Sequence, residues 1–142
     1  MDTTSATLTP ASKVRWLLDN DPAVAGAAAR GTLALGTIES WLVWNLTGGA
    51  HLTDASNASR TQLLGLTGAG WDEGLCELFG VPRAALGQIV DTQGAHASTA
   101  PGLFGTAIPI TGMAGDQQAA TIGQNCLAPG TVKATFGTGA FV

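Results

Sequence analysis

Charge is scarce in this sequence. Only 11% of the 142 residues are Asp, Glu, Lys or Arg, whereas roughly a quarter is usual in soluble domains. The six basic residues are scattered singly, and the net charge is −4. Because no stripe of Lys or Arg is present to neutralise a phosphate backbone, we exclude binding of DNA or RNA as an expected function. The length suits one domain, and the hydrophobic content of 45% predicts apolar surface that faces a second domain or another subunit.

Cysteine and histidine are also rare. Cys76 and Cys126 lack CxxC spacing, and His51 and His96 have no nearby Cys or His partner. We therefore expect neither a disulfide framework nor a metal site, and we predict that both cysteines are buried in a protein of a reducing compartment. No run approaches the ~18 consecutive apolar residues of a membrane span, and the N-terminus lacks the regions of a signal peptide. These absences predict a cytoplasmic protein without membrane contact.

The most informative stretch runs from Ile108 to Gln124. A short apolar run leads into glycines, and Asp116 then opens a helical pattern of small residues. This pattern predicts a strand, a turn and a helix, in which Gly112 and Gly115 permit unusual backbone angles or close approach. At the helix start the Asp116 carboxylate can accept free N–H groups, and the helix dipole favours its ionised form. By itself, the pattern fits a plain helix cap.

Four further helices are predicted before this stretch. Ser12 is the expected N-cap of a helix over 13–20, and Asp21 precedes a second helix that stops at 30–31. An apolar helix is expected over 37–46, and its tryptophans, Trp41 and Trp44, are predicted to be core residues, because aromatic side chains supply large buried area. The fourth helix opens at 71–73 and closes at Gly80. Residues 51–54 suit a short strand, 55–61 a turn tied by side-chain hydrogen bonds, and 91–106 a loop with possible hairpin pieces.

A hairpin is predicted at the end of the sequence. After the breaker Pro129-Gly130, residues 131–136 alternate as a strand, 137–139 form a glycine turn, and 140–142 begin a return strand. A second arm cut short leaves an unpaired ladder, so we expect the sequence to be a fragment.

A carboxylate and a glycine turn together suit phosphoryl transfer. Glycine turns approach phosphates closely and donate main-chain hydrogen bonds. The carboxylate takes a proton from the attacking hydroxyl, and such a positioned base contributes ~10²–10⁴ in rate. Neither a Walker GxxxxGK[ST] motif nor GxGxxG is present. The residues alone therefore indicate a phosphate-handling α/β fragment.

Five blocks, in this order, resemble the glycerol kinases of the FGGY carbohydrate kinase family and cover nearly the whole chain: 13–19, 36–44, 53–61, 115–120 and 135–141. The resemblance implies an α/β fold of the actin-like, ribonuclease-H-like ATPase class, with two domains around a deep cleft. Residues 1–130 would be the later part of the first, polyol-binding domain. Residues 131–142 would be the opening hairpin of the second, nucleotide-binding domain.

The resemblance also implies ATP-dependent phosphorylation of glycerol, with ATP and Mg²⁺ as cofactors. By the family pattern, Asp116 is the catalytic base and contacts glycerol, Gln117 helps to hold the polyol, and Phe141 packs on its carbon skeleton. Gly137 and Thr138 would contact the nucleotide phosphates. The partners implied are glycerol, ATP, the remainder of the kinase chain and further copies in a homo-oligomer.

Several family features are absent from this segment. These are a separate phosphate loop, an Arg-Glu pair that grips glycerol, and the adenine pocket; Leu8-Thr9-Pro10 stands where the family has an aromatic residue, and the sequence has no tyrosine. We therefore expect the isolated chain to be inactive. Two alternatives stay open, a kinase of another polyol or sugar in the same family and a non-catalytic relic binding module. The 57–61 block and the helix with Trp41 and Trp44 favour glycerol.

Overall fold

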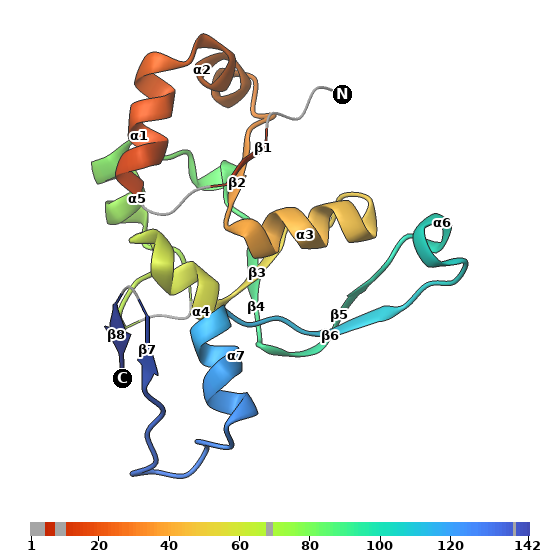
Figure 1. Ribbon diagram of the computed structural model, residues 1–142. Helices are drawn as coiled ribbons and strands as arrows, with labels where there is room; N and C mark the ends of the chain where they lie inside the picture. The colour runs from red at the N-terminus through yellow and green to blue at the C-terminus, as the bar shows by residue number, and fades with distance from the viewer. Residues whose placement is uncertain (1–4, 8–10, 68–69, 138) are drawn as a thin grey trace.

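The computed structural model describes residues 5–7, 11–67, 70–137 and 139–142. Short strands and helices follow one another along the chain, which confirms the predicted mixed α/β architecture (Figure 1). The helices are α1 (Ala11–Asn20), α2 (Pro22–Ala29), α3 (Ile38–Thr47), α4 (Ala55–Ala58), α5 (Glu73–Phe79), α6 (Pro101–Phe104) and α7 (Asp116–Gly123), with 3-10 turns η1 (Ser59–Thr61) and η2 (Arg83–Ala85). The strands are β1 (Ser5–Thr7), β2 (Ala34–Gly36), β3 (Leu52–Asp54), β4 (Gln88–Val90), β5 (Gln93–Ser98), β6 (Pro109–Gly112), β7 (Thr135–Phe136) and β8 (Ala140–Phe141).

Two parallel strand pairs lie at the centre of the molecule. β1 pairs with β2, and β3 pairs with β4 with Leu52 opposite Gln88. An isolated parallel bridge between Leu35 and Leu86 connects β2 to the residues just before β4. Parallel neighbours need a crossover connection, and helices supply it here: α1 and α2 between β1 and β2, α4 and α5 between β3 and β4.

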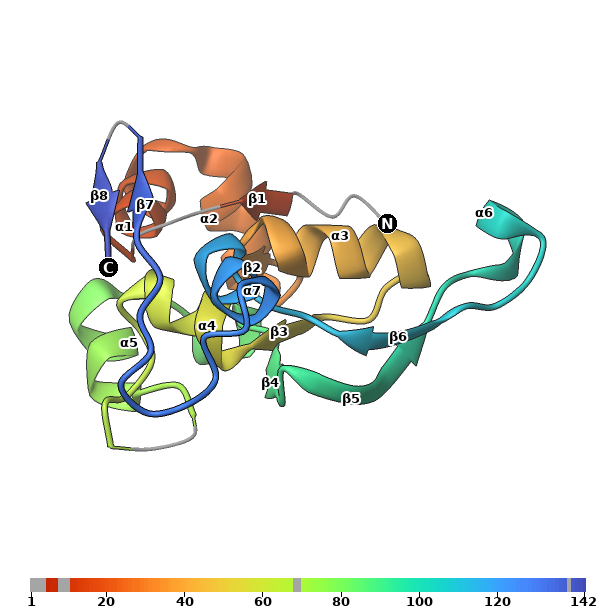
Figure 2. The same ribbon diagram turned by 60° about the horizontal axis from the view of Figure 1, so that its bottom comes forward.

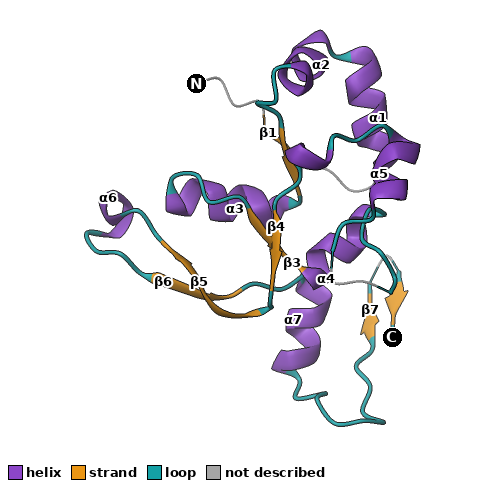
Figure 3. Cartoon of the chain, turned by 180° about the vertical axis from the view of Figure 1, so that it is seen from behind, coloured by secondary structure: helices purple, strands orange, loops and turns teal. Residues whose placement is uncertain are grey.

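The hydrophobic core lies where α1, α2 and α5 gather at one end of the molecule, as Figure 3 shows from behind. Burial of these aliphatic side chains is the main favourable term in folding this end of the chain. Its buried members are Ala11, Val14, Val24, Ala27, Leu33, Leu35, Leu63, Cys76, Val81, Ala85 and Leu86. The predicted burial of Cys76 is therefore confirmed, whereas Cys126 is only half-buried and outside this core.

Most predicted helix ends are confirmed. Asp21 caps α2 by accepting from Ala23 N at 2.8 Å, and Asp72 caps α5 by accepting from Leu75 N at 2.9 Å. Gly80 ends α5 with a left-handed φ of 62°, a conformation that favours glycine. Within the described residues the longest helices, α1 and α3, have ten residues each, and no helix is long and apolar enough to cross a membrane.

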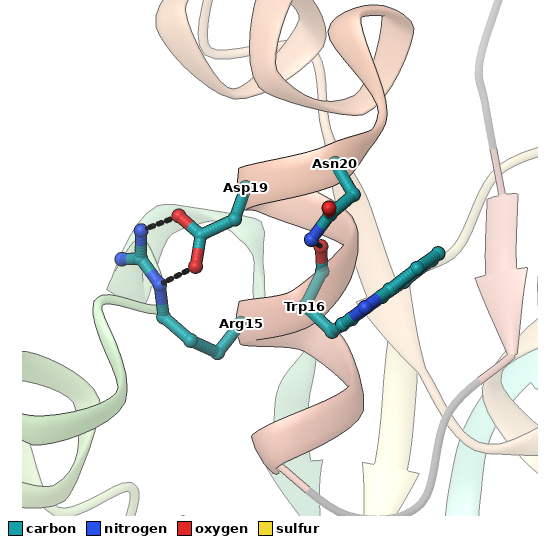
Figure 4. Close-up of polar contacts among 4 residues, drawn as sticks. All are labelled: Arg15, Trp16, Asp19 and Asn20. Atoms are coloured by element: carbon teal, nitrogen blue, oxygen red, sulfur yellow. Dashed lines mark hydrogen bonds and ion pairs between the residues drawn. The ribbon is translucent and has the colours of Figure 1, made fainter.

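The predicted cap of α1 is wrong, because the helix begins one residue before Ser12 and includes it. Along its exposed side Arg15 pairs with Asp19, and Asn20 Nδ2 donates to the Trp16 carbonyl at 2.8 Å (Figure 4). The Trp16 ring points away from the helix and is 61% exposed. Such an exposed ion pair contributes little to stability.

Helix α3 turns its large apolar side chains away from the core. Its small residue Ser40 is buried against β2, so closely that a Cβ on Gly36 would lie 2.5 Å from the Ser40 Cβ. This close packing needs a small residue at position 40, and the large residues Ile38, Trp41 and Leu42 project elsewhere from the helix. The prediction that both tryptophans are core residues is therefore wrong for Trp41, while Trp44 is half-buried and meets His51 edge-on. The exposed large residues of α3 are Ile38 at 58%, Trp41 at 42% and Leu42 at 46%.

Residues 55–61 form helical structure and not the predicted turn. Asp54 ends β3 and caps α4 by accepting from Asn57 N at 2.9 Å. The expected hydrogen bond from side chain to backbone is thus present, but it starts a helix that η1 continues. A capping aspartate satisfies N–H groups that the helix itself leaves free.

An antiparallel arm formed by β5 and β6 extends from the body, with α6 at its tip (Figures 1 and 2). Gln93 pairs with Gly112 and Ser98 with Pro109. The hairpin pieces expected within 91–106 are therefore present. Residues 101–109 at the outer part of the arm are all exposed.

The C-terminal hairpin is shorter than predicted. β7 covers only Thr135–Phe136 of the expected strand 131–136, and it pairs with β8 with Thr135 opposite Phe141. Gly137 N donates to Gly139 O at 2.9 Å within the turn. In both ribbon views this hairpin lies on the same side of the molecule as α7 (Figures 1 and 3).

Candidate active site

The junction between β6 and α7 has the predicted form of a strand, a turn and a helix. β6 ends at Gly112, and Asp116 is the first residue of α7. Asp116 Oδ1 accepts from Gln117 N at 2.9 Å, so the carboxylate satisfies one free N–H group of the helix start. Gly115 has an ordinary φ of −61°, and a Cβ there would lie 2.7 Å from the end of the exposed Gln118 side chain and 3.4 Å from Ser56 Oγ. The Asp116 residue itself is exposed.

The turn before Asp116 is held by two segments distant in sequence. Met113 N donates to the carbonyl of Thr92 at 2.9 Å, and Gly115 N donates to Ser56 Oγ at 2.7 Å. Ser56 belongs to α4, which lies beside the start of α7 in Figures 1 and 2. Tertiary contacts, and not only the local turn, therefore fix where α7 begins.

Asp116 and Gln117 border a cavity of about 680 Å³, within the size range of small-molecule sites. One wall comes from α3 and is mostly aliphatic, whereas polar groups come from the α4–η1 segment and α7. The lining residues are Ile38, Glu39, Leu42, Val43, Leu46, Asn57, Arg60, Ile110, Gly112, Met113, Ala114, Gly115, Asp116, Gln117, Gln118, Phe141 and Val142. An aliphatic wall opposite a few polar groups suits a small polyol with a carbon skeleton and hydroxyl groups.

Gln117 is oriented by a lysine. Lys133, only 8% exposed, donates from Nζ to Gln117 Oε1 at 2.5 Å. An ammonium group has donors and no acceptor, so the atom that faces it is the amide oxygen. The amide NH₂ group of Gln117 is the part left to donate elsewhere.

The other predicted site residues are distributed unequally. Phe141 on β8 lines the same cavity as Asp116 and Gln117, so the fold brings these three together. Gly137 is not among the described residues that line it, and its N–H group is used inside the hairpin turn. Thr138 lies outside the described residues.

Glu39 is a second carboxyl group at the cavity, which the sequence did not single out. Its Oε2 accepts from Thr53 Oγ1 at 3.0 Å and from Asp54 N at 3.1 Å. Its Oε1 is buried without a hydrogen-bond partner among the described residues. Burial raises the pKa of Glu39, and the nearby charge of Asp54 acts in the same direction, against the lowering effect of the two hydrogen bonds.

The residues that the structure describes form no dedicated metal site. In the described part of the chain, no group of three His, Cys, Asp or Glu side chains could hold a metal ion. Mg²⁺ needs less from a protein when it arrives with a nucleotide, because phosphate oxygens and water then supply most ligands. Of the two cavity carboxylates, Asp116 is the exposed one.

Residues 2–123 match the N-terminal domain of the FGGY family of carbohydrate kinases. The chain belongs to this family. The glycerol kinase of Rhodospirillum rubrum is 54% identical to it over 132 residues, which is 92% of this chain and 27% of that enzyme. The crystal structure of Plasmodium falciparum glycerol kinase with ADP matches with a TM-score of 0.84 and 37% identity, over 90% of this chain and 26% of that one.

Fold similarity extends to a second solved kinase. The ligand-bound xylulose kinase of Lactobacillus acidophilus matches with a TM-score of 0.61 at 23% identity, over 82% of this chain and 24% of that one. At this identity the match shows similarity of the fold alone. The FGGY chain described here spans about a quarter of the length of the curated relatives it matches.

Three contributors to this FGGY site were not predicted from the sequence. Ser56 lies in a block whose polar residues were interpreted as a turn, Glu39 in a helix interpreted as apolar, and Lys133 in an alternating strand pattern. The available signal was polarity in an unexpected place, most clearly a lone lysine among small and apolar residues. Their roles depend on contacts between residues 14 to 59 positions apart, which no local pattern specifies.

Proposed function

We propose that these residues form part of an ATP-dependent glycerol kinase, which transfers the γ-phosphoryl group of ATP to glycerol and yields glycerol 3-phosphate. The observation that carries the proposal is the meeting of Asp116, Gln117 and Phe141 at one cavity. The identity to glycerol kinases, 54% over nearly the whole chain, supports glycerol as the substrate. The glycerol kinase of Plasmodium falciparum crystallised with ADP, which supports an adenine nucleotide as the phosphoryl donor.

In this mechanism Asp116 acts as the general base. Its carboxylate takes the proton from a glycerol hydroxyl while that oxygen forms a bond to the γ-phosphorus and the bond to the ADP oxygen breaks. The transition state of such a transfer is loose, so a weak base held in position suffices. Asp116 is the first residue of α7 and borders the cavity, so its carboxylate is placed beside the substrate space.

Gln117, Phe141 and the α3 wall would hold the substrate. The Gln117 amide NH₂ group, left free by the contact of its oxygen with Lys133, donates to a glycerol hydroxyl oxygen. Phe141 and the aliphatic wall pack against the carbon skeleton. Gly137 and Thr138 are assigned to contacts with the nucleotide phosphates. The Gly137 N–H group donates to the Gly139 carbonyl, so Gly137 would allow close approach of the phosphates and would not donate this N–H group to them. Mg²⁺ bound with ATP would offset phosphate charge.

The proposed enzyme has the actin-like arrangement of two domains around a cleft. Residues 1–130 are assigned to the later part of the first domain and 131–142 to the opening hairpin of the second. Most contacts with ATP would then be made by other parts of the kinase, and the 142 residues alone would not turn over. A cytoplasmic location, where ATP is present, and a homo-oligomeric assembly complete the proposal.

The proposal is tested by Asp116→Asn in a kinase chain as long as those of its glycerol kinase relatives. This chain is called the complete kinase below. Loss of the base should lower kcat about 10²–10⁴-fold, while the circular dichroism spectrum and thermal midpoint stay unchanged. Asp91→Asn is the matched control, because Asp91 is exposed and is not among the lining residues of the cavity. Near-normal turnover of Asp116→Asn would show that the assignment of the base is wrong.

A kinase of another polyol or sugar is the second candidate. The cavity is large for a three-carbon triol, and the fold matches a xylulose kinase as well. A comparison of kcat/KM for glycerol, xylulose and longer polyols separates the two candidates. No phosphorylation of any of them, together with measurable polyol binding, would instead favour the non-catalytic binding module.

A further inference from the structure

Asp54 is a buried carboxylate with an unusually full set of hydrogen bonds. The residue has no exposed surface. Its Oδ1 accepts from Ser56 Oγ at 2.9 Å, from Asn57 N at 2.9 Å and from Asn57 Nδ2 at 3.0 Å, and its Oδ2 accepts from Thr92 Oγ1 at 2.7 Å. Burial opposes ionisation, but the hydrogen bonds from Asn57, Thr92 and Ser56 outweigh it and lower the pKa of Asp54. A buried charge needs such compensation to be tolerated.

Two of these donors also hold the turn that leads to the proposed base. Ser56 donates its hydroxyl proton to Asp54 and accepts the N–H of Gly115 at 2.7 Å. Thr92 donates its hydroxyl proton to Asp54 and accepts the N–H of Met113 at its carbonyl, at 2.9 Å. Both ends of the turn 113–115 are thus attached to residues that Asp54 itself fixes.

The direction of each hydrogen bond follows from proton counting. A serine hydroxyl carries one proton and two acceptor lone pairs. The Ser56 hydroxyl points its proton at the Asp54 carboxylate in a hydrogen bond. The Ser56 lone pairs are therefore available to accept from the Gly115 N–H group. The buried charge therefore sets the polarity of the contact with the turn.

Capping of α4 does not explain this arrangement. A cap requires only the bond from Asn57 N, which is local. The bonds from Thr92 to Asp54 and from Gly115 to Ser56 join residues 38 and 59 positions apart. They connect three separate segments at the point where Asp116 leaves the turn.

We propose that Asp54, Ser56 and Thr92 are positioning residues that fix the turn 113–115 and thereby aim the carboxylate of Asp116 at the substrate hydroxyl. This inference rests on the proposed function of Asp116 as the base. A base that shifts by a fraction of an ångström loses much of its effect, because proton transfer requires a narrow range of distance and angle.

Ser56→Ala in the complete kinase tests the network. We expect kcat to fall about tenfold or more, KM for ATP to stay within about twofold, and hydrogen exchange at the Gly115 amide to accelerate. Ser56→Thr keeps the hydroxyl group and should restore most of the activity. Ser59→Ala removes a hydroxyl from the adjoining turn η1 that donates only to the Ser56 carbonyl, so it is the matched control and should leave kcat unchanged.

Thr92→Val provides a second variant at the other end of the turn. It removes the hydroxyl group that donates to Asp54 but keeps the carbonyl that accepts from Met113. It should lower kcat in the same way, and the double variant with Ser56→Ala should lose less than the product of the two single effects, because both act on one turn.

The possible results separate this inference from the proposed function. Turnover within twofold of normal in Ser56→Ala, in an enzyme that Asp116→Asn inactivates, would overturn the positioning network alone. An equal loss in Ser59→Ala, or unchanged Gly115 exchange in Ser56→Ala, would overturn it as well. Retained turnover in Asp116→Asn would overturn the proposed base, and with it any role of the network in catalysis.

Discussion

Replacement of Lys133 by methionine should weaken glycerol binding in the complete kinase while the fold is retained. Lys133 is buried, and its ammonium group contacts the Gln117 amide oxygen. Methionine has similar length and an apolar stem, so it can occupy the same space. Without the ammonium group, nothing determines which end of the amide faces the cavity.

The size of the effect follows from the freedom that Gln117 regains. Immobilising one flexible side chain on binding costs about 0.5–1.5 kcal/mol, which corresponds to about a 2- to 12-fold increase in KM for glycerol. The value of kcat should change less, because Asp116 accepts its helix-start hydrogen bond from Gln117 N and not from the side chain. KM for ATP should not change.

Steady-state kinetics with glycerol varied at saturating ATP measures these values. Lys13→Met is the matched control, because Lys13 is the other lysine of the sequence and lies exposed on α1. Lys133→Arg keeps the donors and the charge and should show a smaller increase than Lys133→Met. An unchanged KM for glycerol in Lys133→Met, or the same increase in Lys13→Met, would refute this explanation of the Gln117 orientation.

Two further predictions concern stability. Leu63→Ala in the core should destabilise the protein by about 2–5 kcal/mol in denaturant unfolding, whereas Leu66→Ala at a fully exposed position should change it by less than about 0.5 kcal/mol. Burial lowers the pKa of His51, although its contact with the Leu35 carbonyl acts in the opposite direction. As the pH falls, His51 in the unfolded chain therefore takes up a proton at a higher pH than His51 in the folded chain. The stability of the fold should consequently fall as the pH drops below about 6.5. His51→Gln should remove that pH dependence, and an unchanged slope would contradict it.

Local chemistry was sufficient to predict several elements. Asp21 and Asp72 start helices because their side chains satisfy N–H groups two or three residues away, an interaction within a single turn. Gly80 ends α5 because it adopts a left-handed conformation that other residues resist. The strand, turn and helix around Asp116 were predicted for the same reason, since glycines and a carboxylate at a helix start have local effects.

Other features depended on neighbours that are distant in sequence. Trp41 is exposed because α3 approaches β2 through its small residue Ser40, a choice that the apolar pattern of α3 does not reveal. Residues 55–61 are helical where Asp54, the last residue of β3, caps the segment and is held in place by the distant Thr92. The strand pattern before Thr135 was interrupted where Lys133 turns to Gln117.

The sequence by itself determined the family, the five longest helices and the identity of Asp116 as the residue to test. These properties reside in motifs and in short-range hydrogen bonding. Only the tertiary structure decided which side chains share the cavity with Asp116, and that Ser56 and Lys133 hold its surroundings in place. Hydrogen bonds across 16 to 59 residues form only after the segments have packed, so their partners are set by the fold and not by spacing along the chain.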